Sequence, residues 1–314
     1  MLRFALRRVG QMLPTLALAV VAVFFLARAM PGDAVSAMLG ERGTDEAVKR
    51  ITAELGLDRS VPEQLWSYVT LLAQGNLGMS IGARVPVLQL VAERLPATLL
   101  LTLMAIILSL LLSLPLAFIA ALRAGRWQDV AVRSGLQVGL SAPIFFLGLL
   151  LLTLFAAQWR IFPVGGYGDT PLEHIYHLFL PALTLALSFT AVATRSLRAS
   201  LLGTLRAEHV AFARSKGLPE SVVMRSHVLR PAAAATVSLV GLQIGGLLGG
   251  AVITESVFAI PGVGRLMVDS IFARDYPVVQ GLTLVLAVLV SLTFLVTDLT
   301  VAWLDPRATQ RRRA

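Results

Sequence analysis

Six long stretches without a charged residue dominate this sequence and decide what it can fold into. They run over Val9–Ala27, Pro96–Leu122, Ser134–Trp159, His174–Thr194, Pro231–Thr254 and Tyr276–Thr297. A helix crosses the hydrocarbon core of a bilayer with about 20 apolar residues, and each stretch is about that long or longer. Lipid offers no partner to unpaired backbone groups, and the alternating pattern of barrel strands is absent. The predicted fold class is therefore an all-α polytopic membrane protein with six transmembrane helices.

Pro115, Pro143 and Pro181 lie inside three of these stretches. Proline removes a backbone donor and clashes with the preceding helical turn, but membrane helices tolerate the resulting kink better than soluble ones do. We therefore expect bent spans.

The composition agrees with a membrane protein. Charged residues make up 14% of the 314 residues and hydrophobic residues 56%, and the mean hydropathy is +0.78. Soluble domains carry about 25% charged residues, so an ordinary soluble enzyme is excluded. The chain contains no cysteine, which excludes disulfides and thiolate metal sites.

The positions of Lys and Arg indicate which side of the membrane each loop faces, because cytoplasmic loops retain basic residues. With the N-terminus inside, 17 of the 27 basic residues are cytoplasmic and 13 of the 18 acidic residues are external. The net charge of +9 then divides into +12 inside and −3 outside. Both termini are expected in the cytoplasm, and the basic balance indicates topology rather than a nucleic-acid partner.

The first stretch has some features of a cleaved secretory signal, including basic residues before it and the triplet Ala27-Arg28-Ala29. It is longer than the apolar core of a typical signal peptide, and Pro31 follows closely. We therefore expect a retained first transmembrane helix.

The external segment Met30–Leu95 is too long for a turn and too small for a substantial independent domain. Within it, Pro62–Gln74 has apolar residues at helical spacing and a proline in the first turn. A short helix is predicted, lying on the membrane or on the outer face of the protein. Contact with a substrate receptor is the alternative.

The cytoplasmic segment Arg195–Arg230 is basic, rich in alanine, and interrupted by Gly217 with Pro219 shortly after it. Glycine is favoured directly after a helix end and proline a little later, so two short helices are predicted. A basic amphipathic helix of this kind can rest on anionic lipid or serve as a docking element for a soluble partner.

The fifth stretch carries glycines at a spacing that lets helices approach closely, which predicts packing against protein. These are Gly241, Gly245, Gly246, Gly249 and Gly250. The loop that follows contains Pro261, Gly262 and Gly264 among apolar side chains, and we expect it to fold back into the external mouth.

A search for catalytic motifs finds no phosphate-binding loop, no H-E-x-x-H and no G-x-S-x-G, so ATP hydrolysis is not assigned to this chain. Glu173, His174 and His177 have the ligand types of a metal site, although histidines near the start of a span are more often interfacial. Asp298, near the inner end of the last stretch, is the candidate intramembrane ionisable residue.

Several runs of this sequence resemble the permease family of dipeptide, oligopeptide and nickel ABC importers. They are EHVAFARSKGL, HVLRPA, GLQIGGLLGGAVITESVFAIPGVGRLMVDSIFARDYPVVQG and the terminal Asp305-Pro306-Arg307. The runs LGLDRSVPEQLWSYV and QGNLGMS resemble its external segment. The resemblance covers nearly the whole chain and implies the type I ABC importer permease fold.

By this resemblance, Glu208–Lys216 is a coupling helix that enters a cleft on an ATPase, and Gly217 ends it. The implied coupling residues are Glu208, Ala211, Ala213, Arg214, Lys216, Gly217 and Leu218. The implied external-mouth residues are Glu255, Pro261, Gly262, Gly264 and Asp275. The sequence departs from the general ABC-importer pattern, because Ala211 stands where a glutamate is usual and Pro231 falls one place late. The small alanines would still permit close docking.

The resemblance also implies partners: a homologous second permease, two cytoplasmic ATPases and an extracytoplasmic substrate-binding protein, with membrane lipid around the spans and no nucleic acid. No cofactor is expected in this chain, because ATP and magnesium would be bound by the partner ATPases. The location implied is the bacterial inner membrane.

Three regions are expected: residues 1–95 with the first helix and external segment, residues 96–306 as a five-helix core with the coupling loop 195–230, and the basic cytoplasmic tail 307–314. The expected substrates are di- and oligopeptides, with nickel or glutathione as alternatives for the same architecture. An ion-coupled secondary transporter is the alternative from another class, but it would need ionisable groups near the bilayer midplane, and none of the six stretches contains a charge. A membrane-embedded enzyme lacks a candidate motif.

Overall fold

The computed structural model describes residues 2–29, 46 and 58–304. They form α1 (Leu2–Ala29), α4 (Val61–Ala73), α5 (Val87–Leu122), α6 (Trp127–Ser141), α7 (Ile144–Leu151), η2 (Leu152–Gln158), α8 (Pro171–Leu205), α9 (Glu208–Ser215), α10 (Glu220–Val222), η3 (Val223–Leu229), α11 (Arg230–Val257), α12 (Val263–Phe272) and α13 (Tyr276–Leu304). The segments η2 and η3 are π-helical. The expected tail 307–314 and Asp305-Pro306-Arg307 lie outside the described residues.

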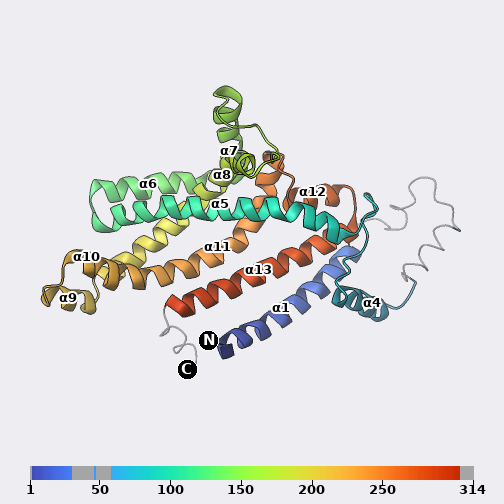
Figure 1. Ribbon diagram of the computed structural model, residues 1–314, viewed down its shortest axis with the longest axis horizontal. Coiled ribbons are helices and arrows are strands. Elements are labelled where there is room, and N and C mark those ends of the chain that lie inside the picture. Colours follow the sequence, from blue (N-terminus) through green and yellow to red (C-terminus); the bar gives the residue numbers. More distant parts are fainter. Residues whose placement is uncertain (1, 30–45, 47–57, 305–314) are drawn as a thin grey trace.

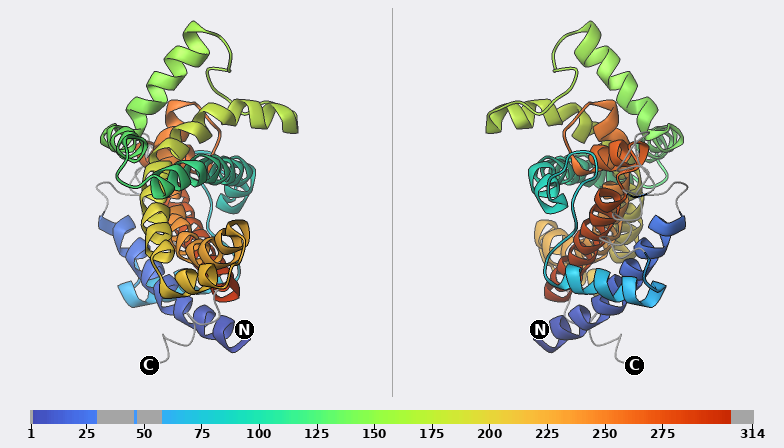
Figure 2. Two further views of the ribbon diagram at one scale, coloured as in Figure 1. Left: turned by 90° about the vertical axis from the view of Figure 1, so that its left-hand side faces the viewer. Right: turned by 90° about the vertical axis from the view of Figure 1, so that its right-hand side faces the viewer.

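The long helices lie side by side with α6 running along α5, and other short helices lie at the two ends. Figure 1 shows α9 and α10 at one end of α5, α8 and α11, and α4 and α12 at the other. The start of α1 and the end of α13 point towards the end that carries α9. Figure 2 shows α7 and the first turns of α8 projecting from the other helices as a hairpin.

The all-helical fold class predicted from the sequence is confirmed, and in the part of the chain that the structure describes four helices are long and apolar enough to cross a membrane. Within these helices the qualifying segments are Ala5–Leu26, Val87–Leu122, Pro171–Leu205 and Tyr276–Trp303, with shorter apolar helices at Ile144–Gln158 and Gly245–Val257. Five of the six predicted stretches each fall within a single helix, and each of these helices is longer than the stretch. The helix α8 shows this most clearly, because it continues to Leu205 and takes in the first part of the expected coupling loop.

The third predicted stretch, Ser134–Trp159, is wrong as a single helix. It is divided between α6 and α7–η2, and the break falls at Ala142, whose backbone is extended with ψ of 128°. The ring of Pro143 disfavours helical geometry in the residue before it, which explains the break. Pro115 and Pro181, in contrast, lie inside continuous helices.

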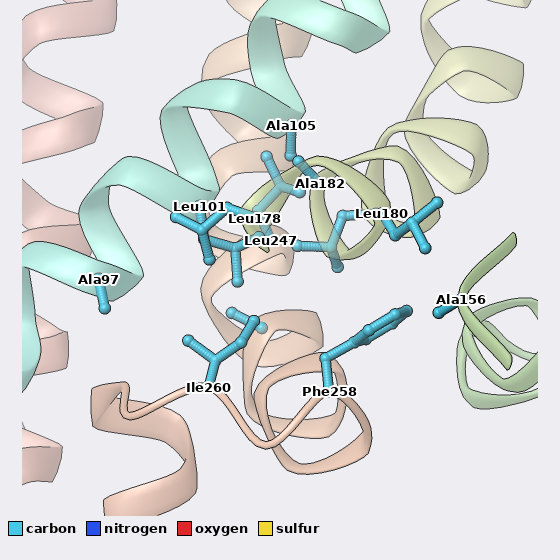
Figure 3. Packing of buried hydrophobic residues seen from close by; sticks show 12 residues of the cluster. Ala97, Leu101, Ala105, Ala156, Leu178, Leu180, Ala182, Leu247, Phe258 and Ile260 are labelled. Atoms are coloured by element: carbon cyan, nitrogen blue, oxygen red, sulfur yellow. The ribbon is translucent and has the colours of Figure 1, made fainter. Parts of the chain in front are cut away.

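The largest core cluster joins α5, α8, α11 and the residues that follow α11. It contains Leu101 of α5, Leu178 and Leu185 of α8, and Phe258 after α11, all at most 1% exposed. Figure 3 shows these helices crossing closely where Ala105 and Ala182 face each other. Lipid tails are as apolar as leucine, so burial from water does not drive this contact, and close van der Waals packing at small residues stabilises it instead.

The first helix is tied to the rest of the chain at both ends. Near its start, Arg8 Nη2 lies 3.0 Å from Asp298 Oδ1 of α13, so the ionisable residue noted in the sequence is part of an ion pair between helices. Near its end, Phe24 packs against Tyr68 of α4, with ring centroids 5.9 Å apart. The short helix predicted over Pro62–Gln74 is confirmed as α4, whose Trp66 is 70% exposed.

Candidate functional site

The helix α9 stands at the end of the molecule as a short amphipathic element between α8 and α10. It begins after Ala207, whose backbone is extended, and its capping residue is Lys216. Gly217 follows with φ of +74°, the left-handed conformation that the sequence predicts for the residue ending this helix. Its backbone N–H donates to the carbonyl of Arg214 at 2.9 Å. The chain therefore turns sharply at a residue where only glycine is free of strain.

One face of α9 is built into the protein. Val210 and Ala213 are buried in a cluster with Leu197 and Leu201 of α8 and Val223 of η3. The small size of Ala213, expected to permit docking of a partner, therefore serves packing within the chain. This contact makes α9 part of the same packed unit as the end of α8.

The opposite face of α9 is open. A shallow depression of about 610 Å³ is lined by Glu208, His209, Ala211, Phe212 and Ser215. Phe212 is 61% exposed, and the Lys216 Nζ lies 4.6 Å from the centre of its ring. An exposed aromatic side chain beside a cation is a typical anchor at protein interfaces. Phe212 is not among the coupling residues predicted from the sequence. An aromatic residue on the polar side of a short basic helix could have indicated this contact surface.

An ion pair braces the turn at Gly217. Arg214 Nη2 lies 2.5 Å from Glu220 Oε1, and Arg214 Nε donates to Glu220 Oε2 at 3.1 Å. Both side chains are well exposed, so water screens the pair and it contributes little to stability. Leu218, between them, is 38% exposed and belongs to the same surface.

The glycines of α11 divide into two groups. A Cβ at Gly241 would lie 2.0 Å from the Thr297 side chain, and one at Gly245 would contact Val290, so these glycines let α11 approach α13. Gly250 similarly faces α8, where a Cβ would lie 3.3 Å from Leu185. Gly246 and Gly249 have no described atom within 4 Å of such a Cβ and leave a small-residue face open.

Three of the expected mouth residues, Glu255, Gly262 and Gly264, meet at the start of α12. The carboxylate of Glu255, fully buried, accepts from Thr98 Oγ1 at 2.6 Å and from the Arg265 backbone N–H at 3.0 Å. Thr98 Oγ1 in turn accepts from the Val263 N–H at 2.9 Å. An acid at a helix N-terminus satisfies donors that the helix leaves unpaired. A Cβ at Gly262 would lie 2.2 Å from this carboxylate, so the close approach requires glycine.

A second carboxylate holds the neighbouring loop. Asp275 is 4% exposed and accepts from Ser80 Oγ at 2.5 Å and from the backbone N–H groups of Ile81 and Gly82 at 3.1 and 3.0 Å. The loop before α5 is thereby fixed to the turn between α12 and α13. Glu255 and Asp275 therefore organise the loops at the two ends of α12, and Pro261, just before α12, is half-buried.

A third carboxylate, Asp129, joins α6 to α8 at the end where α9 lies. It is 1% exposed, and Arg198 binds it through Nε and Nη2, both at 2.7 Å, with Arg133 at 3.3 Å. The hydrogen bonds from Arg198, and to a lesser extent the Gly125 N–H and the charges nearby, hold the pKa of Asp129 below its usual value. This cluster was not predicted from the sequence, because no sequence pattern indicates that Asp129 and Arg198, 69 positions apart, lie in contact.

We expect Asp129→Asn to destabilise the protein at neutral pH by about 1.5–3 kcal/mol, since hydrogen bonds to charged groups are worth that much. A lowered pKa means that the carboxylate contributes fully above the usual pKa of aspartate and that its contribution is lost as pH falls through the folded-state value. The difference in melting temperature between wild type and mutant, followed by intrinsic fluorescence, should stay constant from about pH 8 to pH 5 and shrink below that. The exposed Asp169→Asn serves as control, and a difference that grows in acid would contradict the assignment.

The candidate metal ligands organise a loop. The Glu173 carboxylate accepts from the Asp169 N–H at 2.8 Å, and the Nδ1 atoms of His174 and His177 face the carbonyls of Tyr167 and Gly165 at 2.8 and 2.9 Å. Within the described ranges no group of three His, Asp or Glu side chains is arranged to hold a metal ion.

Comparison with known proteins gives two family matches. The model for the binding-protein-dependent transport system inner membrane component matches residues 113–310, and the model for the N-terminal part of such membrane components matches residues 1–102. The glutathione transport system permease protein of Pectobacterium atrosepticum is 35% identical over 306 residues, which cover 98% of both chains. The dipeptide transport system permease protein of Escherichia coli K12 is 34% identical over 339 residues, covering 99% of this chain and 100% of the relative.

Among solved structures, the inward-facing methionine ABC transporter MetNI aligns with a TM-score of 0.59 at 16% identity, covering 69% of this chain and 97% of that chain. This likeness shows the fold. The family match over residues 113–310, together with relatives at 34–35% identity along nearly the whole length, shows that this chain belongs to the family of binding-protein-dependent transport system inner membrane components.

Proposed function

We propose that this chain forms half of the translocation pathway of an ABC importer for short peptides. Its family makes it a permease subunit and a multi-pass protein of the bacterial inner membrane. Relatives named for dipeptide and glutathione transport support a peptide substrate, because glutathione is itself a tripeptide. The observation that carries the proposal is α9, a helix built into the bundle on one face and open, with Phe212, on the other.

The open face of α9 is the proposed contact with an ATPase subunit. Phe212 and Ala211 would enter a cleft on that subunit, while Val210 and Ala213 hold the helix on α8. When ATP closes the ATPase pair, movement of α9 would pass to α8 and α5 as a rigid body and switch the pathway between the two sides. The turn at Gly217 sets the direction of the helix.

The remaining partners follow from the family, which implies ATPase and substrate-binding subunits. We infer two ATPases, a second related permease and one extracytoplasmic binding protein. The open glycines Gly246 and Gly249 support close approach of another helix, as expected at an interface with a second permease. The loops fixed by Glu255 and Asp275 would receive the binding protein.

The chemistry is translocation, so we infer that this chain has no catalytic residue of its own. ATP and magnesium would be bound by the partner ATPases. The absence of a phosphate-binding loop in the sequence supports this division.

We infer six spans with both chain ends in the cytoplasm. The third span would be Ser134–Trp159, which falls on the end of α6 and on α7–η2, and the fifth would lie within α11. The basic residues support this orientation, because 17 of 27 fall on the inferred inner side. The division into residues 1–95, 96–306 and 307–314 follows from the same topology.

Cysteines introduced at Asn76 and Arg206 are expected to be labelled from opposite sides by a reagent that does not cross membranes. Both positions are exposed, and the native chain has no cysteine to interfere. Asn76 should react in intact spheroplasts, and Arg206 only after the membrane is opened. Reaction of both in intact spheroplasts would contradict the topology.

Purification of this chain from its native host tests the proposed function. A tagged chain should bring down a second permease and ATPase subunits, and the complex should hydrolyse ATP faster when the peptide-loaded binding protein is added. The chain purified alone should hydrolyse no ATP above background. Turnover that follows this polypeptide in the absence of an ATPase would refute the proposal.

A further inference from the structure

A cavity of about 570 Å³ lies between α6 and α8, away from the surface of α9 described above. Its polar wall consists of Arg133, Ser134 and Gln137 of α6 and Thr194, Arg195 and Arg198 of α8. The volume is within the range of about 300–1,000 Å³ that is usual for small-molecule sites.

The cavity lies at the ends of the uncharged stretches of α6 and α8. The uncharged stretch of α6 begins at Ser134, directly after Arg133, and the uncharged stretch of α8 ends at Thr194, directly before Arg195. Both arginines are on the side inferred to be cytoplasmic. The cavity therefore lies at the inner boundary of the membrane.

Positive charge is in excess around this cavity. Arg198 and Arg133 share the single carboxylate of Asp129. Within the described part of the chain, Arg195 Nη2 donates a hydrogen bond to the uncharged amide of Gln137, at 3.0 Å from Oε1. The guanidinium of Arg195 thus keeps its charge available to an anion. A planar guanidinium matches a carboxylate with two parallel hydrogen bonds.

Thr194 adds an unused donor at the same place. Thr184 and Thr190 of the same helix donate to carbonyl groups four residues earlier, at 2.9 and 2.7 Å. The hydroxyl of Thr194 is buried and has no partner among the described residues. A buried hydroxyl without a partner is costly, which favours a site that is completed by something bound.

The exposed face of α6 has the character of a water-filled pathway rather than of a lipid contact. Ser134, Gln137 and Ser141 recur at intervals of three and four residues, so they share one face of the helix, and all three are exposed. Polar side chains within membrane helices almost always face the protein interior or a water-filled cavity. The helix α6 is also not among the segments apolar enough to qualify as a span by themselves.

We propose that this cavity is a subsite of the translocation pathway that binds the C-terminal carboxylate of a peptide before its release into the cytoplasm, with Arg195 as the binding cation. The inference rests on the proposed function and names the chemical group of the substrate that this chain recognises. Arg195 is exposed to solvent at one side, so the contact is weak enough to release the peptide.

The test is a saturation-transfer NMR titration of the assembled permease–ATPase complex in nanodiscs of zwitterionic lipid, without the binding protein. The probes are the dipeptide Ala-Ala and its C-terminal amide. The free acid should bind at least about tenfold more tightly than the amide, which lacks the charge-assisted contact; tenfold corresponds to about 1.4 kcal/mol. Arg195→Gln should remove the difference, and Arg195→Lys should restore part of it.

A second variant keeps the test valid if Arg195→Gln impairs assembly. Gln137→Glu places a carboxylate beside Arg195, which should preserve the contact between α6 and α8 while occupying the cation, so that binding of the free acid falls to that of the amide. Arg126→Gln, at the start of α6 and outside the cavity, is the matched control and should bind like wild type.

Equal binding of acid and amide by wild type, or an unchanged preference in both Arg195→Gln and Gln137→Glu, would overturn the proposal. Addition of phosphatidylglycerol tests whether the anion bound in the cavity is a lipid phosphate and not a peptide carboxylate. If that lipid binds with dependence on Arg195 and the free-acid dipeptide does not, the cavity is a lipid-phosphate site and the proposal fails.

Peptide uptake by the wild-type complex is measured in parallel. Uptake with a negative binding test refutes this inference alone, whereas absence of any peptide uptake refutes the proposed function.

Discussion

Replacing Gly217 by valine is expected to uncouple ATP hydrolysis from transport while leaving the protein in the membrane. Gly217 has φ of +74°, and no atom of the described residues lies within 4 Å of where its Cβ would be, so the cost comes from backbone strain. For a β-branched residue that strain is about 1–2 kcal/mol, which lowers the population of the native turn by roughly 5- to 30-fold. The last turn of α9 would unwind or point away from the ATPase. The stimulation of ATPase activity by the loaded binding protein and the uptake of peptide should both fall several-fold.

Two variants separate coupling from general strain. Gly75→Val imposes the same strain, because Gly75 has φ of +75° and no atom in the described ranges within 4 Å of its Cβ position, but it lies on the other side of the inferred membrane. Gly217→Asn should be milder than Gly217→Val, since asparagine tolerates the left-handed conformation. Both comparisons are made on proteoliposomes with equal amounts of assembled complex. Normal uptake and normal stimulation in Gly217→Val would remove the coupling role from α9 and leave it as a helix on the lipid surface.

Replacing Thr98 by valine is expected to give the largest loss of stability. The change keeps the shape of the side chain but removes the hydroxyl that donates to Glu255 at 2.6 Å and accepts from the Val263 N–H at 2.9 Å. A fully buried carboxylate then loses a donor and a helix N–H loses its acceptor, which together cost about 2–5 kcal/mol. The start of α12 should loosen. The purified protein should melt several degrees lower, and protease sites near Arg265 should become accessible.

Thr102→Val is the matched control for this change. Thr102 lies one turn further along α5, is 6% exposed, and its hydroxyl donates only to the Thr98 carbonyl within its own helix. Its loss should cost much less, because that carbonyl keeps its helical partner. Thr98→Ser, which retains the hydroxyl, should restore most of the stability. Equal melting temperatures for Thr98→Val and Thr102→Val would show that the bonds to Glu255 do not organise the external loops.

The sequence predicted the helices because the apolar stretches are long and uncharged, and it predicted the turn at Gly217 because glycine has a distinct conformational range. It did not predict the ends of α8, since the helix continues through Arg195–Leu205 with mixed residues that pack on α9. The sequence also predicted a bent but continuous helix at Pro143, where the structure has a break. Proline is compatible with either a kink or a break, and only the packing of the two halves decides between them.

The three carboxylate clusters were beyond prediction from a single sequence. Glu255 pairs with Thr98 at a separation of 157 residues, and Asp275 binds Ser80 at a separation of 195. Sequence patterns indicate which residues lie on one face of a helix, but not which helices come together. For this reason Glu255 and Asp275 were predicted as part of the external mouth, and their role in holding its loops emerged only with the fold.

The most direct test of this account is ATP-driven peptide accumulation in proteoliposomes that contain this chain, the second permease and the ATPases. We predict that a labelled dipeptide accumulates only with internal magnesium and ATP and with the binding protein outside, and that vesicles lacking this chain accumulate none. Accumulation driven by a proton gradient without ATP, or equal accumulation in vesicles without this chain, would contradict the account.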